Sequence, residues 1–260
     1  MLFSEEGARF PKSIGSSGVW AGQIPLQDAW NLKEVVGEAT QKSELERIGF
    51  LGDTPCGYEA VPLAAHFELH IGTNTIILFY SLIINFAAEQ GPILEQTSRK
   101  VGIVIGGQAV RWYTITVIGR ECHTGSTPFT ARSDAMLCAA KIIVASNSIA
   151  KKHGGVASTG IIYAYPGSTN TVPGRVILSM DMRHLQDEKL DAMDAELHKE
   201  AQRIAKEDSE KGCQLEWRLD TDAKATHFHP DCIQCVKESA EATVGKDMAM
   251  EIVSGAGHDR

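Results

Sequence analysis

The chain has 260 residues, and its 25 Lys and Arg against 33 Asp and Glu leave a formal net charge of −8 at pH 7. An acidic chain lacks the positive charge that supplies most nonspecific affinity for nucleic acids and anionic membranes, so neither partner is expected. A hydrophobic content of 43% with 22% charged residues is ordinary for a globular protein and excludes global disorder.

Cysteine usage and hydropathy indicate a cytoplasmic protein. Six cysteines are spread through a chain that is too long to need disulfide staples, so we expect reduced thiols. The N-terminal MLFSEEGARF has neither the basic flank nor the long apolar region of a secretory signal. The apolar run from Ile76 to Ala88 has 13 residues. A membrane-spanning helix needs about 20 residues, so no span is expected.

The first predicted elements are two helices and a strand. Residues 26–37 favour a helix. Residues 112–118 alternate between apolar and polar side chains, which predicts a strand with Tyr113, Ile115 and Val117 on one face. Residues 133–151 begin with Ser and Asp and end just before Gly154, the pattern of a capped helix.

Two further strands, a helix and a final strand follow. The strands are expected at 159–165 and 174–183, joined by the turn PGSTNTVPG. The second strand places four apolar side chains on one face: Val176, Leu178, Met180 and Met182. Apolar residues at steps of three and four then predict an amphipathic helix through Leu190, Met193, Leu197, Ala201 and Ile204. The last strand alternates through Cys213, Leu215, Trp217 and Leu219.

The order strand, helix, strand, strand, helix, strand is that of a split βαβ, ferredoxin-like unit. We place this unit at 108–222, inserted between the two parts of a discontinuous domain, 1–107 and 223–260. A helix preceded by Pro230 is expected at 231–244 in the second part. The fold class is therefore α/β.

Four polar motifs could carry chemistry. Glu5 and Glu6 are adjacent carboxylates that can serve different partners, one a metal and the other a water, although a solvated acidic turn is the simpler interpretation. His70 in ELHI lies between apolar residues, where a histidine of the core is the common alternative to a ligand. His123 lies in a loop of Gly, Ser, Thr and Pro between a strand and a helix, and such loops often carry function.

The fourth motif pairs Asn170 of the PGSTN turn with Arg183 at the end of the next strand. Asn is expected in a turn for backbone reasons alone. The planar guanidinium of Arg183 suits bidentate binding of a carboxylate, and a structural pair with Asp181 is the alternative. A separate group of His and Cys at 227–235 looks like a zinc site, but we expect Cys232 and Cys235 to face a core from one helix.

Several motifs, taken in order, resemble the di-zinc amidohydrolases of the aminoacylase and carboxypeptidase clan. Within the clan they are most similar to the branch of N-carbamoyl-L-amino-acid hydrolase, β-ureidopropionase (β-alanine synthase) and allantoate amidohydrolase. The motifs are SEEGARF, GSSGVWAG, ELERIGFLG, ELHI with the later EQGPILE, CHTGSTPFTARSDA, NTVPGRVILSMDMRH and SGAGHD. The resemblance implies an α/β catalytic domain interrupted by a βαββαβ lid and dimerisation domain, in agreement with the inserted unit, and a homodimer formed through that lid.

The resemblance also implies roles for single residues. Glu5 matches the general base, Glu6 a zinc ligand and His70 a ligand of the other zinc. His123 matches the lid histidine that stabilises the tetrahedral intermediate, often across the dimer interface. The matched substrate-binding positions are Gln90, Asn170, Arg183, which would hold the substrate carboxylate, and His258, a further active-site histidine.

The implied reaction is zinc-dependent hydrolysis of the carbamoyl C–N bond of N-carbamoyl amino acids such as N-carbamoyl-β-alanine. Its products are the amino acid, ammonia and carbon dioxide. Two Zn²⁺ ions per subunit (or Mn²⁺ or Co²⁺) activate a shared water whose proton Glu5 accepts. The alternatives are an aminoacylase or dipeptidase of the same clan, or an inactive fragment that retains only the dimerisation domain.

Two departures from the family pattern concern the metal site. The first zinc-ligand His and the bridging Asp of the family precede the EEG segment, and its last zinc-ligand His follows GAGHD. This chain starts and ends close to those segments. Of the family's protein ligands only Glu6 and His70 remain, so we expect a chain truncated at both ends whose metal site is incomplete.

The third departure is an insertion at 72–88, GTNTIILFYSLIINFAA, which splits what reads in the family as ELHIEQGPILE. It has no charged residue and is rich in amino acids with A/T-rich codons. We interpret it as a translated, unspliced intron of a eukaryotic gene. With the insertion His70 and Gln90 are 20 positions apart, and without it they would be 3 apart.

We predict that the mature messenger RNA lacks the codons for residues 72–88. Sequencing the transcript across this region checks the prediction. A mature message that encodes all 17 residues would contradict it.

Overall fold

A computed structural model of the chain describes residues 9–12, 15–35, 37–60, 64–65, 92–207 and 210–255. The chain divides into two compact units. One consists of Met1–Gln108 with Thr226–Arg260, and the other, the inserted unit, is Ala109–Ala225. Among the described residues, no helix combines the length and the apolar character that crossing a membrane requires.

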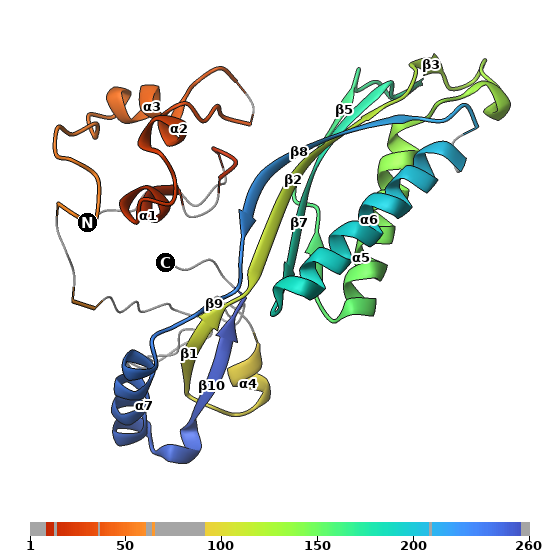
Figure 1. Cartoon of the computed structure of the whole chain (residues 1–260). Helices are drawn as coiled ribbons and strands as arrows, with labels where there is room; N and C mark the ends of the chain where they lie inside the picture. The colour runs from red at the N-terminus through yellow and green to blue at the C-terminus, as the bar shows by residue number, and fades with distance from the viewer. Residues whose placement is uncertain are drawn as a thin grey trace, which may run out of the picture. The chain divides into compact units, whose positions relative to one another are not determined.

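The inserted unit is an antiparallel sheet with two helices packed on one face (Figure 1). Its strand order is β4–β7–β2–β8, and β5 also pairs with β7. The strands are β2 (Ala109–Ile118), β4 (Val156–Ser158), β5 (Ile162–Tyr165), β7 (Arg175–His184) and β8 (Gln214–Ala223). The central pair, β2 and β7, runs in register from Ala109 opposite His184 to Ile118 opposite Arg175. This is the predicted split βαβ topology.

The period of two along a strand decides which side chains meet the helices. The predicted apolar faces of β2 and β7 are buried, with Ile115, Val117, Val176 and Leu178 completely inaccessible to solvent. The intervening side chains of both strands point to the opposite face of the sheet.

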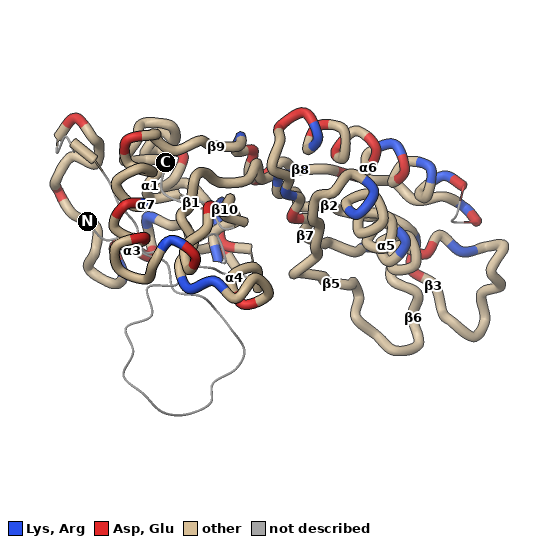
Figure 2. The backbone as a smooth tube through the Cα atoms, turned by 90° about the horizontal axis from the view of Figure 1, so that it is seen from below, with Lys and Arg blue, Asp and Glu red and all other residues tan. Residues whose placement is uncertain are grey.

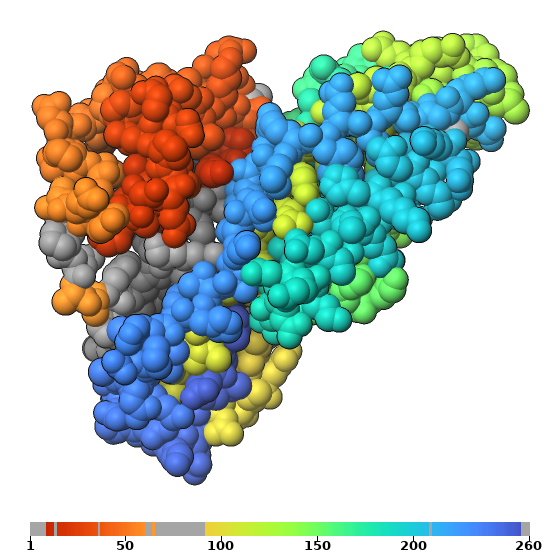
Figure 3. All heavy atoms as spheres, viewed as in Figure 1, coloured from red at the N-terminus to blue at the C-terminus, as the bar shows by residue number. Residues whose placement is uncertain are grey.

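The two helices match the sequence pattern, α5 in its capping residues and α6 in its buried stripe. Helix α5 (Ala135–His153) starts after Asp134, whose side chain accepts a hydrogen bond from the amide of Leu137, and stops at Gly154 with φ of 80°. Helix α6 (Asp187–Glu207) buries the predicted stripe, from Leu190 to Ile204, at no more than 2% exposure. Its other faces carry both signs of charge (Figure 2), and its side chains form much of the surface of this unit (Figure 3).

Two local predictions are wrong. The helix expected at 26–37 ends at Trp30, because Lys33 forms a bridge with Thr40 and the Glu34 carboxylate accepts from the amide of Ala39. The strand expected at 159–165 is present only from Ile162, as β5, since the Ser179 hydroxyl accepts hydrogen bonds from the amides of 160 and 161, and the separate strand β4 ends before the expected range.

Leu219, the last residue of the alternation in the predicted final strand, is 52% exposed. The pairing of β2 with β8 shifts register at this point, where Tyr113 lies opposite Leu219 and Trp112 opposite Thr221. A bulge of this kind re-aims side chains locally. It lies on β8, which is an edge strand of the sheet.

The other unit contains a small sheet in the order β10–β1–β9, in which β1 and β10 are parallel. The predicted helix at 231–244 is present as α7. The bounds of these elements are β1 (Val101–Gly107), β9 (Thr226–His227), β10 (Ala249–Ser254), α7 (Pro230–Val244), α4 (Ile93–Gln96) and η2 (Lys246–Met248). Strands β1 and β10 were not predicted from the sequence.

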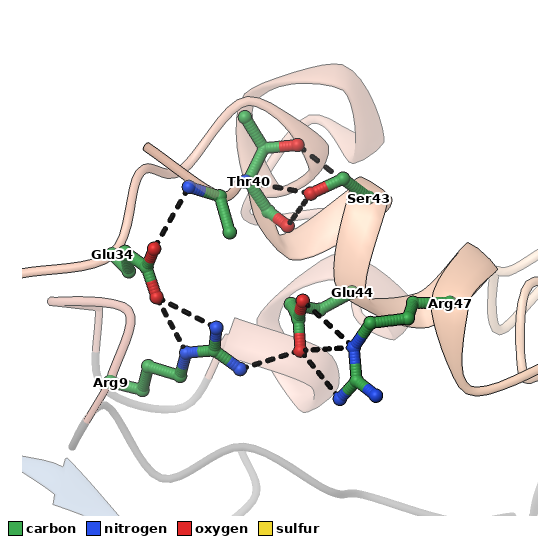
Figure 4. Close-up of polar contacts among 7 residues, drawn as sticks. Arg9, Glu34, Thr40, Ser43, Glu44 and Arg47 are labelled. Atoms are coloured by element: carbon green, nitrogen blue, oxygen red, sulfur yellow. Dashed lines mark hydrogen bonds and ion pairs between the residues drawn. The ribbon is translucent and has the colours of Figure 1, made fainter. Parts of the chain in front are cut away.

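The N-terminal part of this unit is held by an arginine between two carboxylates (Figure 4). Its helices are α1 (Gly15–Trp20), α2 (Leu26–Trp30) and α3 (Gln41–Arg47). Arg9 donates to Glu34 at 2.8 Å and to Glu44 at 2.6 Å, and Arg47 also donates to Glu44 at 2.9 Å. Hydrogen bonds from Arg47, followed by those from Arg9, lower the pKa of Glu44 to about 2.

We predict that Leu197→Ala destabilises the inserted unit by about 2–5 kcal/mol, because Leu197 is completely buried and its loss leaves a cavity. Urea unfolding followed by circular dichroism measures the effect. Leu185→Ala is the matched control, since Leu185 is 50% exposed, and it should stay within about 0.5 kcal/mol of the wild type. Equal losses in the two variants would contradict the assigned core.

We predict that the Glu44 carboxyl titrates near pH 2, below the ordinary value of 4.5. A depressed pKa in the folded state means that the contacts of Glu44 stabilise the fold above the ordinary pKa and are lost as the pH falls toward 2. The titration is followed by carboxyl ¹³C nuclear magnetic resonance. Arg47→Met should raise this pKa, whereas Lys12→Met, the removal of a positive charge that has no contact with Glu44, should not.

Candidate functional site

The structure describes three of the predicted site residues, His123, Asn170 and Arg183. The other five lie outside the described residues, as does the insertion at 72–88. They are Glu5, Glu6, His70, Gln90 and His258. Their assigned roles therefore stay predictions.

His123 and Asn170 lie together at one end of the inserted unit. Strand β3 (Cys122–His123) pairs with β6 (Thr171–Val172), with His123 opposite Thr171. The amide of Thr124 donates to the carbonyl oxygen of Asn170 at 2.9 Å. Both side chains are exposed. The two residues, which are 47 positions apart along the chain, are thus brought together by the pairing of two short strands.

The Asn170 side chain has the local role that its turn predicts. Its Oδ1 atom accepts a hydrogen bond from the Ser168 hydroxyl at 2.9 Å. Such contacts stabilise a turn without any ligand. Its place beside His123 is what makes Asn170 a candidate for substrate binding.

The ring of His123 is held by its own loop. Nδ1 accepts hydrogen bonds from the backbone amides of Gly125 and Ser126, both at 3.2 Å. The loop continues through the short helix η1 (Phe129–Ala131) to the start of α5. The contacts that close it come from Arg132, which the sequence analysis did not identify. In the sequence, Arg132 can be recognised only as the arginine of the ARSDA segment.

Arg183 is paired with Asp181, as the structural alternative predicts. Nε donates to Oδ1 at 2.9 Å and Nη2 donates to Oδ2 at 2.7 Å, a bidentate contact between neighbours on one face of β7. The side chains are 22% and 28% exposed. The pair fixes the plane of the guanidinium, and the face of the sheet on which it lies is the one opposite the helices.

Arg183 lies far from His123 within one chain. Strand β6, which pairs with the His123 strand, ends just before Arg175, the first residue of β7, and Arg183 lies near the other end of β7 (Figure 1). At about 3.3 Å per residue, the eight steps from 175 to 183 span roughly 26 Å. One chain therefore cannot place both side chains around a single small substrate.

A second arginine, Arg111 on β2, has only a structural role. It donates to Asp191 at 2.8 Å, Asp194 at 3.0 Å and Asp222 at 3.1 Å, which connects the sheet to α6 and β8. Burial lowers the pKa of Arg111, but hydrogen bonds to Asp191 and Asp222 outweigh it and the pKa is raised. The guanidinium is thus charged at every ordinary pH and neutralises carboxylates rather than binding a ligand.

Cysteine and histidine side chains form no metal site in the part of the chain that the structure describes. Within it, no group of three or more His, Cys, Asp or Glu could hold a metal ion. His229 caps α7, where its Nδ1 accepts from the amide of Asp231 at 3.3 Å. The prediction that Cys232 and Cys235 both face a core is wrong for Cys235, which is exposed. None of the six cysteines, all of which lie among the described residues, forms a disulfide.

Comparison with known proteins confirms the family resemblance. Residues 105–209 match the model of the peptidase dimerisation domain. The N-carbamoyl-L-amino-acid amidohydrolase of Rhizobium meliloti is 36% identical over 258 residues, which cover 98% of this chain and 56% of the relative. Allantoate deiminase 1 of Glycine max is 27% identical over 283 aligned residues. The chain thus spans about half the length of the curated relatives it matches.

Solved structures agree with this result. An amidase of the hydantoinase/carbamoylase family from Burkholderia vietnamiensis matches with a TM-score of 0.81 and 36% identity, over 98% of this chain and 56% of that chain. A second amidase of that family, from Burkholderia multivorans, matches with a TM-score of 0.70 and 40% identity. The predicted α/β fold class is confirmed. The chain belongs to the family of amidohydrolases that carry the peptidase dimerisation domain, in the branch of the N-carbamoyl-L-amino-acid amidohydrolases and allantoate deiminases.

Proposed function

We propose that this protein hydrolyses the carbamoyl C–N bond of N-carbamoyl amino acids, with N-carbamoyl-β-alanine as one substrate. The observation that supports this most is the 36% identity, over 98% of the chain, to a protein named as an amidohydrolase of N-carbamoyl-L-amino acids. The described residues that would act are Arg183, Asn170 and His123.

Arg183 would bind the substrate carboxylate. Its contact with Asp181 orients the guanidinium, and a substrate carboxylate would either join the pair or compete with Asp181. His123 would donate a hydrogen bond to the oxygen that gains negative charge as the carbamoyl carbon becomes tetrahedral. Asn170 would hold the carbamoyl end of the substrate beside His123.

The metal stays a proposal. Two Zn²⁺ ions would supply an activated water, and Glu6 and His70 would be among their ligands with Glu5 as the general base. The described residues do not contain a ligand cluster that fits such a pair, so no step is derived through it. Zinc content measured on the purified protein tests this proposal separately from the assay.

The separation of the site residues supports a homodimer formed through the lid. Because Arg183 and His123 cannot meet within one chain, we propose that His123 and Asn170 of one protomer complete the site of the partner. The inserted unit offers apolar surface for this contact: Val144 on α5 is 68% exposed, and Ile162 and Tyr165 lie exposed on β5 at the sheet edge. Sedimentation velocity measures the oligomeric state.

A second candidate is a folded dimerisation module without catalysis. The inserted unit favours it because its core is formed by its own residues, 109–225. A dimer that binds no zinc and hydrolyses none of the substrates would support this candidate.

A third candidate is an aminoacylase or dipeptidase of the same clan, which would show turnover of N-acyl amino acids instead. We also propose a cytoplasmic location.

We predict that Arg183→Ala lowers kcat/KM for N-carbamoyl-β-alanine by about a hundredfold or more, because a desolvated guanidinium–carboxylate contact is lost. The amide of the same substrate has no carboxylate, so the variant's kcat/KM for this amide should change by less than about threefold. Release of ammonia measures both rates.

Arg175→Ala is the control for this test, because Arg175 lies on the same strand but stacks on Tyr165 at 4.4 Å. Equal losses of kcat/KM for the acid and the amide would show that Arg183 does not bind the substrate carboxylate and acts only through its contact with Asp181. Assays of allantoate and an N-acyl amino acid beside N-carbamoyl-β-alanine define the substrate class. A wild-type protein that turns over none of them would overturn the proposed function.

A further inference from the structure

The loop that carries His123 is closed by one arginine, Arg132. Its Nη2 atom donates to the carbonyl oxygen of Thr124 at 2.6 Å, and its Nε atom donates to the carbonyl oxygen of Thr127 at 2.9 Å. The guanidinium carbon also lies 4.5 Å from the centre of the Phe129 ring. Charged donors to two carbonyls three residues apart hold the loop in one conformation.

Arg132 is itself fixed to the body of the inserted unit. Its carbonyl oxygen accepts a hydrogen bond from the amide of Lys211 at 3.1 Å, and the next residue, Ser133, accepts from the amide of Arg120 at 2.9 Å. The Ser133 hydroxyl donates to the carbonyl oxygen of Gly212. The arginine therefore connects the exposed loop to the body of the inserted unit.

The loop determines which nitrogen of His123 carries the proton. Nδ1 accepts two backbone hydrogen bonds, from Gly125 and Ser126, so its lone pair is in use and it carries no hydrogen. In a neutral imidazole the hydrogen must then be on Nε2. Among the described residues, none accepts a hydrogen bond from Nε2, and the side chain is exposed. Nε2–H is a donor that points away from its own loop.

Glycine at the first of these amides leaves room for the His123 ring. A Cβ atom at position 125 would lie 3.3 Å from Cε1 and 3.6 Å from Nδ1 of His123. The first distance is shorter than ordinary van der Waals contact between carbon atoms, so the imidazole would have to move. The absence of a side chain at Gly125 lets the backbone approach the ring closely enough to donate.

We infer that Arg132 and Gly125 are positioning residues that hold His123 as the neutral Nε2–H tautomer and aim that hydrogen out of the loop. The use of this hydrogen as a donor to a developing oxyanion rests on the proposed function, whereas the tautomer and its two supports do not. A donor that is already oriented does not have to move when negative charge develops on the substrate oxygen. A donor to a developing oxyanion needs this property.

The test is ¹⁵N nuclear magnetic resonance of the histidine rings and backbone of the whole chain at about pH 8, where an ordinary imidazole is neutral. In the wild type, Nδ1 of His123 should resonate as an unprotonated ring nitrogen and Nε2 as a protonated one. His123→Gln assigns the signal among the nine histidines. A hydrogen on Nδ1 in the wild type would overturn the inference.

Arg132→Met keeps the length of the side chain and removes its donors. We expect the amide hydrogens of Gly125 and Ser126 to exchange about tenfold faster or more, and the two ring nitrogens of His123 to move toward averaged shifts. Arg203→Met, on the exposed face of α6, is the control and should change neither signal. Unchanged exchange at both amides in Arg132→Met would overturn the role of Arg132.

Gly125→Ala tests whether the His123 ring can be displaced while the inserted unit stays folded. It keeps the amide donor and every contact of Arg132, yet it should displace the ring and shift the His123 signals, while the amides of β2 and β7 stay as protected as in the wild type. Unchanged His123 signals in this variant would overturn the role of Gly125. Because neither measurement needs turnover, this inference and the proposed function can fail independently.

Discussion

Burial of one face of the β2–β7 pair under α5 and α6 is the constraint on which the rest of the inserted unit depends. Ile115 and Leu178 on the strands and Met193 and Leu197 on α6 are all completely buried. The free energy gained by removing this apolar surface from water holds the two helices on the sheet. The sheet and helices then form a rigid base for the polar residues at the ends and on the outer face.

The same alternation places the arginine that we assign to the substrate carboxylate. Burying Met180 and Met182 under the helices turns Asp181 and Arg183 to the opposite face of β7, where they pair with each other. The position of Arg183 is therefore a consequence of the core. The same geometry separates it from His123 by most of the length of a ten-residue strand, which is the physical basis for our proposal that two protomers share a site.

His123 shows how an exposed loop can hold a side chain precisely. The ring is exposed, so hydrophobic packing does not orient it. Backbone amides from Gly125 and Ser126 fix one edge of the imidazole, and Arg132 fixes the loop that carries those amides. Polar contacts of this kind depend on exact geometry, which explains why both a glycine and an arginine are needed within ten residues.

The sequence by itself determined the inserted unit, because period-two and period-3.6 apolar patterns record directly which face of each element is buried. Local patterns did not show where β4 ends and β5 begins or why Leu219 is exposed, because the Ser179 hydroxyl and the β8 bulge act between distant segments. Motif order identified His123, Asn170 and Arg183. Only the tertiary structure showed that the first two lie together, that Arg183 lies apart and that Arg132 supports His123, since those contacts depend on strand pairing and loop closure.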